Sequence, residues 1–334
     1  MKDGHGRTID YLRISLTDRC NLRCIYCMPE EGVSALNHDE ILRIEEIERI
    51  VRVATRIGIK SVRLTGGEPT VRKGLVDLVS WLSNIPEIKN VSMTTNGVLL
   101  PKMADELHEA GLSRVNISLD TLDRDQYFFI TRRDDYDKCM EGIDAALRVG
   151  FDPVKINAVV VRQLQQDYLG FAKLSIDRPL HVRFIEYMPI GDSAGPFGTG
   201  WGPEDVVPSE ELRDIINREA AKEGIAPLRA LDGDESPLGW GPAKYFAFPG
   251  AKGTVGFISP LSRHFCSECN RLRLTAEGKL RPCLFSDREF DVREALRTGG
   301  EDAVYQVFLQ ALGEKPDEHH DKVGTERKMV QIGG

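Results

Sequence analysis

The sequence predicts an α/β protein built on an incomplete (β/α)6 barrel of the TIM type, followed by a C-terminal domain of different character. The first observation is that six short strand patterns alternate with helical patterns over residues 11–188. Because each strand returns after a helix, the strands are expected to be parallel. The second is that this regularity fades after Met188 and that a loop-rich segment with three further cysteines begins at about Ile225. An open, doubly wound sheet is the alternative arrangement of the same units.

The strand patterns are short runs rich in aliphatic and β-branched residues. They are expected at residues 11–17, 61–66, 91–96, 114–120, 154–161 and 181–188. Helical patterns lie between them, for example at 40–58 and 102–111, and one more helix is expected at 207–224. A loop rich in glycine and proline at 191–205 precedes that last helix, and no role is assigned to it. We expect a barrel domain over residues 1–223 and a second domain over 224–334.

Polar and apolar residues alternate along the strands, whereas parallel strands are usually apolar on both faces. In the first strand Leu12 and Ile14 share one face, and Arg13 and Ser15 share the other. The same alternation places these residues on the polar faces of later strands: Arg63, Thr94, Asn96, Ser118 and Lys155. If the apolar faces pack on outer helices, the polar faces line the barrel and predict a wet cavity for a polar ligand. Pairing of the cations with a polyphosphate is favoured, and pairing with local carboxylates is the alternative.

Composition narrows the class of protein. The 334 residues are 41% hydrophobic and 29% charged, which is typical of a soluble globular chain with a large core. A net charge of −8 argues against a general nucleic-acid binder. The first ten residues lack the apolar core of a signal peptide, and no apolar run approaches membrane-spanning length, so a cytoplasmic location is expected.

Six of the seven cysteines fall into two triads. Cys20, Cys24 and Cys27 follow the first predicted strand, at the end of a barrel where active sites lie. Three thiolates are one short of a closed zinc site, so a 4Fe-4S cluster with one iron left open is favoured. A zinc site that borrows a distant histidine, or free cysteines, are the alternatives.

The second triad is Cys266, Cys269 and Cys283. Taken by itself it favours zinc over iron, with His264 as the fourth ligand. Cys139 stands alone in a helical pattern and is expected to be a small buried residue. The two closing glycines would by themselves indicate a frayed tail.

Taken together, these motifs resemble a known family. Cys20-x3-Cys24-x-Tyr26-Cys27 resembles the cluster-binding signature of radical S-adenosylmethionine enzymes, and Gly66-Gly67-Glu68-Pro69 ends the second strand, where that superfamily holds the amino group of its cofactor. The second triad encloses Arg271-Leu272-Arg273, and the chain ends in Gly333-Gly334. With these additions the chain resembles the GTP 3′,8-cyclase family over nearly its whole length.

The resemblance implies a lyase that acts in the first step of molybdenum cofactor biosynthesis. It implies two 4Fe-4S clusters, with S-adenosylmethionine bound to the open iron of the first. Reductive cleavage of that cofactor gives a 5′-deoxyadenosyl radical, which takes a hydrogen atom from the 3′ carbon of the GTP ribose. The sugar radical then attacks carbon 8 of guanine to form (8S)-3′,8-cyclo-7,8-dihydroguanosine 5′-triphosphate. The second cluster is implied to contact the guanine.

The resemblance also implies a role for each matching residue. The implied cluster ligands are Cys20, Cys24, Cys27, Cys266, Cys269 and Cys283. The positions implied to bind S-adenosylmethionine are Tyr26, Gly67, Ser118 and Met188, the last through its backbone. The positions implied to bind GTP are Arg13, Arg63, Thr94, Lys155, Arg271 and Arg273. Catalysis is implied for the first triad and for Gly333 and Gly334, whose tail would enter the barrel.

The resemblance further implies partners. They are GTP as substrate, an external one-electron reductant, a cyclic pyranopterin monophosphate synthase that takes up the product, and a second copy of the chain in a homodimer. Two other functions stay open at this point. One is a radical enzyme with an auxiliary cluster acting on a peptide, and the other is a non-enzymatic iron–sulfur or zinc protein.

Overall fold

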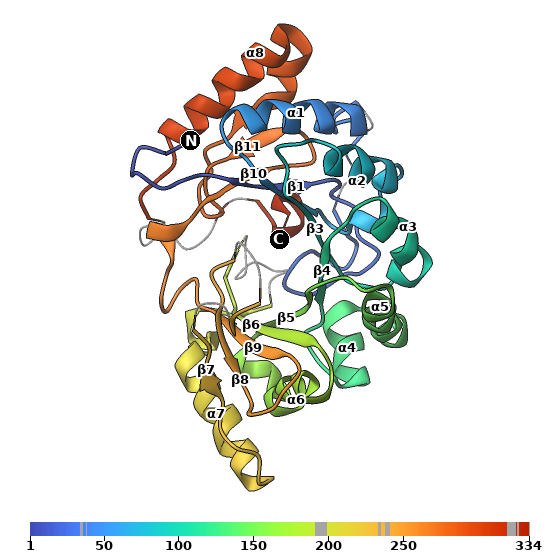
Figure 1. Cartoon of the computed structure of the whole chain (residues 1–334), viewed down its shortest axis with the longest axis vertical. Coiled ribbons are helices and arrows are strands. Elements are labelled where there is room, and N and C mark those ends of the chain that lie inside the picture. The colour runs from blue at the N-terminus through green and yellow to red at the C-terminus, as the bar shows by residue number, and fades with distance from the viewer. Residues whose placement is uncertain are drawn as a thin grey trace.

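The structure is a computed structural model that describes residues 1–33, 36–37, 39–190, 199–232, 235–237, 241–318, 325 and 327–333. Its strands form one curved sheet in the order β12-β11-β10-β1-β2-β3-β4-β5-β6-β9-β8-β7 (Figure 1). The six predicted strands lie at its centre and are parallel to one another. The partial parallel barrel is therefore confirmed.

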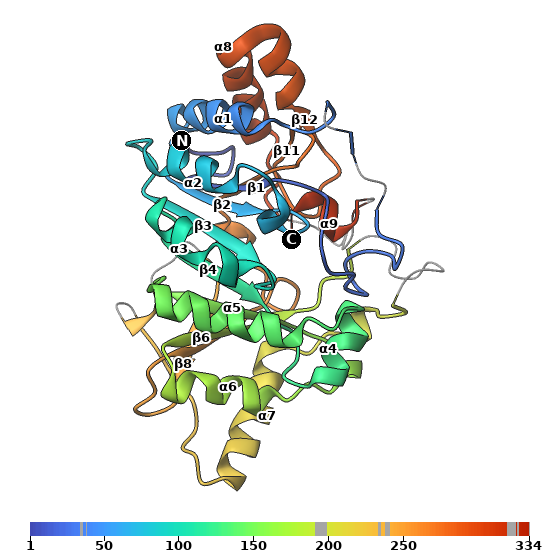
Figure 2. The same cartoon turned by 90° about the vertical axis from the view of Figure 1, so that its right-hand side faces the viewer.

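The central strands agree with the predicted ones to within a few residues at each end. They are β1 (Tyr11–Ser15), β2 (Ser61–Thr65), β3 (Asn90–Thr95), β4 (Arg114–Ser118), β5 (Val154–Val160) and β6 (Leu180–Glu186). Between them lie α1 (Ile44–Arg56), α2 (Leu75–Ser83), α3 (Ala104–Glu109), α4 (Arg124–Thr131), α5 (Tyr136–Val149) and α6 (Tyr168–Asp177). In Figure 2, α1, α2, α3, α5 and α6 follow one another along the outer face of the sheet.

The alternation along the strands is confirmed. Leu12, Ile14, Val62 and Leu64 are fully buried, and they belong to the core between the sheet and the outer helices. Burial of such side chains stabilises the fold by about 1.5–3 kcal/mol each. The polar faces point the other way, toward the concave side. Cys139 in α5 is fully buried in the same core, as expected.

The C-terminal part corrects one expectation. A loop-rich segment is expected there, but its strands extend the same sheet at both edges, with β10 parallel to β1 and β9 parallel to β6. The added strands are β7 (Arg229–Ala230), β8 (Lys244–Ala247), β9 (Thr254–Ile258), β10 (Arg271–Leu274), β11 (Lys279–Arg281) and β12 (Phe290–Asp291). Strands of two to five residues are too short to show a clear period of two. The domain boundary expected after residue 223 stays a prediction.

Within the described residues the remaining helices are α7 (Ser209–Lys222), α8 (Val292–Gly313) and α9 (Met329–Ile332). Short 3-10 turns occur at Pro69–Val71, Leu100–Lys102, Arg162–Leu164, Pro203–Asp205 and Cys266–Glu268. Helix α8 packs beside α1, and α9 lies near the centre of the molecule (Figures 1 and 2). Among the described residues, no helix combines the length and apolar character needed to cross a membrane. Of the loop at 191–205, residues 191–198 lie outside the described part.

Candidate active site

The concave side of the sheet holds a cavity of about 320 Å³ whose wall includes both cysteine triads. These predicted site residues line it: Arg13, Tyr26, Arg63, Gly67, Thr94, Ser118, Met188, Arg271 and Arg273. Lys155 does not line it, although it lies on the same face of β5 as Asn157, which does. The fold therefore brings residues from both ends of the chain into one chamber.

The first triad lies in the loop that leaves β1. A tight turn brings its members together, since the main-chain N–H groups of Cys27 and Met28 both donate to the carbonyl of Cys24. The sulfur of Cys20 accepts from the main chain of Leu22 at 3.4 Å and from the Asn96 amide at 3.8 Å. Soft thiolate donors of this kind suit an iron–sulfur cluster. The residues present therefore fit the group that the signature predicts.

Burial dominates the electrostatics of this triad. It raises the pKa of Cys20 to about 11, with the Glu68 carboxylate adding to the effect. Burial, together with the neighbouring Cys20 and Asp120, raises the pKa of Cys27 to about 12. A hydrogen bond to Cys27 from the main chain of Val330 in α9 lowers the pKa of this thiol in part. Three half-buried thiolates this close together would require a cationic partner, which a metal cluster would supply.

The Gly-Gly-Glu-Pro loop after β2 packs directly on the start of the cysteine loop. The N–H of Gly67 donates to the Thr17 carbonyl at 2.7 Å, and that of Glu68 donates to the Arg19 carbonyl at 2.8 Å. A Cβ on Gly67 would lie 2.3 Å from the Arg19 oxygen, so glycine is required for this approach. The Glu68 carboxylate accepts from Thr95 Oγ1 and the Asn96 N–H, which fixes the end of β3.

A carboxylate that the sequence analysis did not select lies beside the first triad. The hydroxyl of Tyr26 donates to Asp120 Oδ2 at 2.6 Å, and the N–H of Val159 donates to Oδ1 at 2.8 Å. Burial raises the pKa of Asp120 to about 6 against the effect of these two bonds. Asp120 lies two residues after Ser118, just beyond the end of β4, and its parity with the polar positions of that strand is the signal that points to it.

The second triad combines Cys266 and Cys269, in and just after the turn before β10, with Cys283, two residues after β11. Burial raises the pKa of Cys269, but the nearby cations Lys315 and Arg271 outweigh it, and the net shift is downward. His264, the fourth zinc ligand of the alternative, lies 3.8 Å from the Glu318 carboxylate. Among the described residues, no three His, Cys, Asp or Glu side chains are arranged to hold a metal ion. The Cys269 thiolate that these cations favour is a soft donor that suits either zinc or an iron–sulfur cluster.

Between the triads runs a row of arginines. Arg13 is the Cα partner of Arg273 on β10 and of Arg63 on β2, so the three lie side by side on adjacent strands. Adjacent strands are about 4.8 Å apart. Arg271 lies on the same face of β10 as Arg273, as expected for residues two apart.

This row is strongly cationic. Burial, and then the neighbouring guanidinium of Arg271, lower the pKa of Arg273 to about 10. The pKa of Arg13 is lowered for the same reasons, burial first and Arg273 second. Within the described part of the chain, the buried Nε of Arg271 has no hydrogen-bond partner. Arginines held this close are suited to binding a polyanion, which would offset their repulsion.

Two further residues of this wall were missed. Tyr11 lies two residues before Arg13, and four arginines lower its pKa although burial raises it. Arg183 on β6 is buried and donates to Asn157 Oδ1 at 2.9 Å and to Asn116 Oδ1 at 2.8 Å. Both have the parity of inward positions, which is the signal that could have identified them.

Lys155 does not line the cavity but lies beside an aromatic ring. Its ammonium is 5.5 Å from the centre of the Tyr245 ring, and the residue is 3% exposed. Burial, followed by repulsion from Arg183, lowers the pKa of Lys155 to about 6.

Two threonines end β3. The hydroxyl of Thr95 donates to the Glu68 carboxylate, and Thr94 Oγ1 accepts a hydrogen bond from the inward Asn116 amide at 3.4 Å. Both threonines line the cavity, and Thr94 has the inward parity of the strand.

The C-terminal tail enters the barrel. The carbonyl of Gly333 accepts from Arg273 Nη1 at 3.0 Å. Gly333 has a φ of +69°, and a Cβ there would lie 2.9 Å from Thr65 and 3.1 Å from Ser15. The segment up to Gly333 is thus packed, in contrast to a frayed tail. Gly334 lies outside the described residues.

Comparison with known proteins agrees with this geometry. Residues 14–174 match the model of the radical SAM superfamily, and residues 180–321 match that of Molybdenum Cofactor Synthesis C. The fold is therefore that of a radical S-adenosylmethionine protein.

Full-length relatives identify the particular family. The chain is 52% identical to GTP 3′,8-cyclase of Pelotomaculum thermopropionicum, 51% to that of Petrotoga mobilis and 50% to that of Moorella thermoacetica, and each alignment covers 100% of both chains. The chain belongs to the GTP 3′,8-cyclase family.

Among solved structures, SuiB of Streptococcus suis bound to S-adenosylmethionine superimposes with a TM-score of 0.57. The match covers 89% of this chain and 66% of SuiB at 17% identity. SuiB bound to its precursor peptide SuiA gives a TM-score of 0.56 at 18% identity. At such identities the likeness concerns the fold alone.

Proposed function

We propose that this chain converts GTP to (8S)-3′,8-cyclo-7,8-dihydroguanosine 5′-triphosphate, the first step of molybdenum cofactor biosynthesis. The observation that carries the proposal is the shared cavity, in which two cysteine triads are separated by a row of arginines. A nucleoside triphosphate has a polyanionic end for the arginines and a base that reaches a second metal site. A peptide substrate, the alternative within the same superfamily, leaves this charge without a counterpart.

In this proposal the first triad holds a 4Fe-4S cluster, which with bound S-adenosylmethionine supplies a 5′-deoxyadenosyl radical. Tyr26, Gly67, Ser118 and the backbone of Met188 hold that cofactor. Asp120, through its bond from Tyr26, keeps the tyrosine in place between the cluster ligands.

The same proposal gives the second triad a second 4Fe-4S cluster that contacts guanine. The GTP site is assigned to Arg13, Arg63, Thr94, Lys155, Arg271 and Arg273, of which Lys155 does not line the cavity and would act through its charge. Their fixed positions on strands orient the ribose toward the first triad and limit the motion of the substrate. The domain carrying the second triad is taken as residues 224–334.

We assign the tail glycines to catalysis. Gly333 binds Arg273 through its carbonyl, and α9 reaches the first triad through the main chain of Val330. The tail therefore links a proposed GTP ligand with a proposed cluster ligand. Two glycines suit this place, because Thr65 and Ser15 leave no room for a side chain at Gly333.

The wider setting is also proposed. The enzyme works in the cytoplasm as a homodimer, without nucleic acid, and receives electrons from an external one-electron donor. A cyclic pyranopterin monophosphate synthase takes up the product.

The test is anaerobic reconstitution of the full chain with iron and sulfide. We expect about eight irons per chain if each triad holds one cubane, and formation of 5′-deoxyadenosine that GTP stimulates. Mass spectrometry should find the cyclised nucleotide. Cleavage of S-adenosylmethionine at the same rate with and without GTP, and no cyclised product, would refute the proposed substrate.

A further inference from the structure

A buried lysine that the proposed mechanism does not use lies against the second triad. Lys315 follows α8, is 3% exposed, and comes 32 residues after Cys283 in the sequence. Its ammonium lies 3.6 Å from the sulfur of Cys269, 2.9 Å from the carbonyl of Arg271 and 2.7 Å from the carbonyl of Pro282. An ammonium group has three N–H donors, so this geometry provides one acceptor for each.

The three acceptors belong to the two segments that carry the triad. Arg271 is two residues after Cys269, and Pro282 immediately precedes Cys283. Lys315 therefore joins the turn before β10 to the loop after β11. It also supplies a positive charge at one thiolate, where the other two acceptors are neutral.

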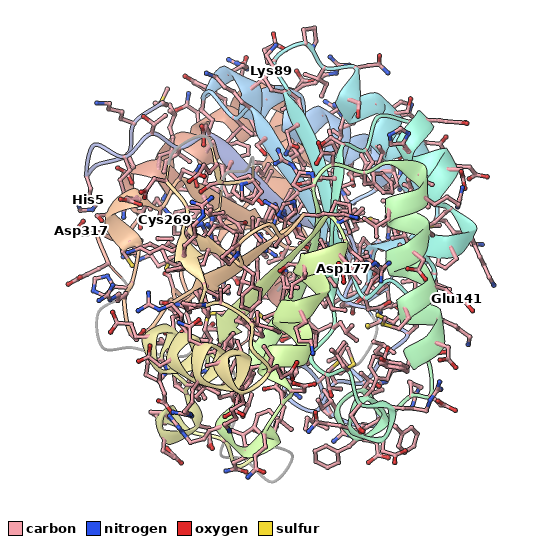
Figure 3. The ribbon with its side chains drawn as sticks, turned by 60° about the horizontal axis from the view of Figure 1, so that its bottom comes forward. His5, Lys89, Glu141, Asp177, Cys269 and Asp317 are labelled. Atoms are coloured by element: carbon pink, nitrogen blue, oxygen red, sulfur yellow. The ribbon has the colours of Figure 1, made fainter. Side chains whose placement is uncertain are left out.

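The N-terminal segment supports the same region from the other side. Arg7 is buried and donates to the carbonyls of Cys266, Pro316 and Asp317 at 2.8, 2.6 and 2.7 Å. His5 lies 3.6 Å from the Asp317 carboxylate. Figure 3 shows His5, Asp317 and Cys269 on the same side of the molecule. Arg7 fixes the segment that carries Lys315, but the bonds it makes there go to main-chain carbonyls.

We propose that Lys315 is a positioning residue of the second triad, which holds the Cys269 thiolate in place and raises the reduction potential of the cluster bound there. This inference rests on the proposed second cluster. Hydrogen bonds to ligand sulfurs, together with net charge, set the potentials of iron–sulfur clusters. A fixed cation stabilises the more negative, reduced state, so its removal makes reduction harder. A compact ammonium suits three acceptors that converge on one point, whereas the planar guanidinium of arginine does not.

The test uses the full chain with the first triad replaced by alanine, so that signals come from the second triad. Lys315→Met keeps the apolar stem and removes the charge, and Lys315→Arg keeps the charge with altered geometry. Iron content and the midpoint potential are measured by anaerobic redox titration followed by electron paramagnetic resonance. We expect Lys315→Met to shift the one-electron reduction equilibrium at least tenfold toward the oxidised cluster, about 59 mV. The midpoint potential of Lys315→Arg should lie between that of Lys315→Met and that of the parent with Lys315 intact.

The matched control is Arg7→Met, which loosens the same loops and leaves the contact with sulfur. We expect it to lower thermal stability and leave the midpoint potential unchanged. Loss of iron in Lys315→Met but retention in Arg7→Met also supports the proposal, because it assigns the holding of the thiolate to Lys315. Equal shifts or equal iron loss in both variants, or an unchanged potential in Lys315→Met, would overturn it. If the parent with an intact second triad binds no iron there, the proposed second cluster fails instead.

Discussion

Lys155 offers a quantitative test of the proposed GTP site. In the free protein, burial and nearby arginines lower its pKa to about 6, so at pH 8 about one chain in a hundred carries a charged Lys155. A bound triphosphate favours the charged form and raises this pKa. At a pH between the pKa of Lys155 in the free protein and its pKa in the GTP complex, the complex holds a proton that the free protein lacks. The affinity for GTP therefore falls as the pH rises through this range.

The magnitude follows from the size of the shift. Charging Lys155 at pH 8 costs about 2.7 kcal/mol, at about 1.36 kcal/mol per pH unit. GTP affinity should therefore fall nearly tenfold between pH 7.5 and 8.5, with uptake of about one proton per GTP. His181, its neighbour on β6, does not titrate in this range, because burial lowers its pKa to about 4.

The assay is isothermal titration calorimetry of GTP binding in buffers that differ in ionisation enthalpy. The matched variants are Lys155→Met, which cannot take up the proton, and Lys155→Arg, which is charged throughout. Both should lose the proton uptake, and only the arginine variant should retain binding strength at pH 8.5. The reasoning is refuted if the parent takes up no proton at pH 8, or if Lys155→Met takes up as much as the parent.

Three further outcomes are expected. Cys24→Ala should abolish cleavage of S-adenosylmethionine and leave about half of the iron, measured by iron analysis beside 5′-deoxyadenosine assays; unchanged cleavage would contradict the first cluster site. Replacing Arg271 or Arg273 by alanine should weaken GTP binding by about 1–3 kcal/mol in calorimetry with iron content unchanged, whereas full affinity in the double variant would make them structural. Deleting Gly333 and Gly334 should preserve iron content and most GTP binding but abolish cyclised product, and full activity would remove the tail from the mechanism.

The sequence by itself determined the features that depend on local spacing. The period of two along β1 placed Leu12 in the core and Arg13 in the cavity wall, because side chains alternate across a strand. The spacing of Cys20, Cys24 and Cys27 marked a thiolate site, since one short loop keeps them together. These inferences required no knowledge of distant contacts.

Tertiary structure decided what depends on pairing between distant segments. Arg273 joins the arginine row because β10 pairs in parallel with β1, about 260 residues away in the sequence, and nothing in either strand specifies that partner or its register. Lys315 belongs to none of the sequence motifs described above, and its role appears only because the chain returns to place it against Cys269. Burial then shifts the pKa values of Lys155 and Asp120, because desolvation depends on every element packed around a group.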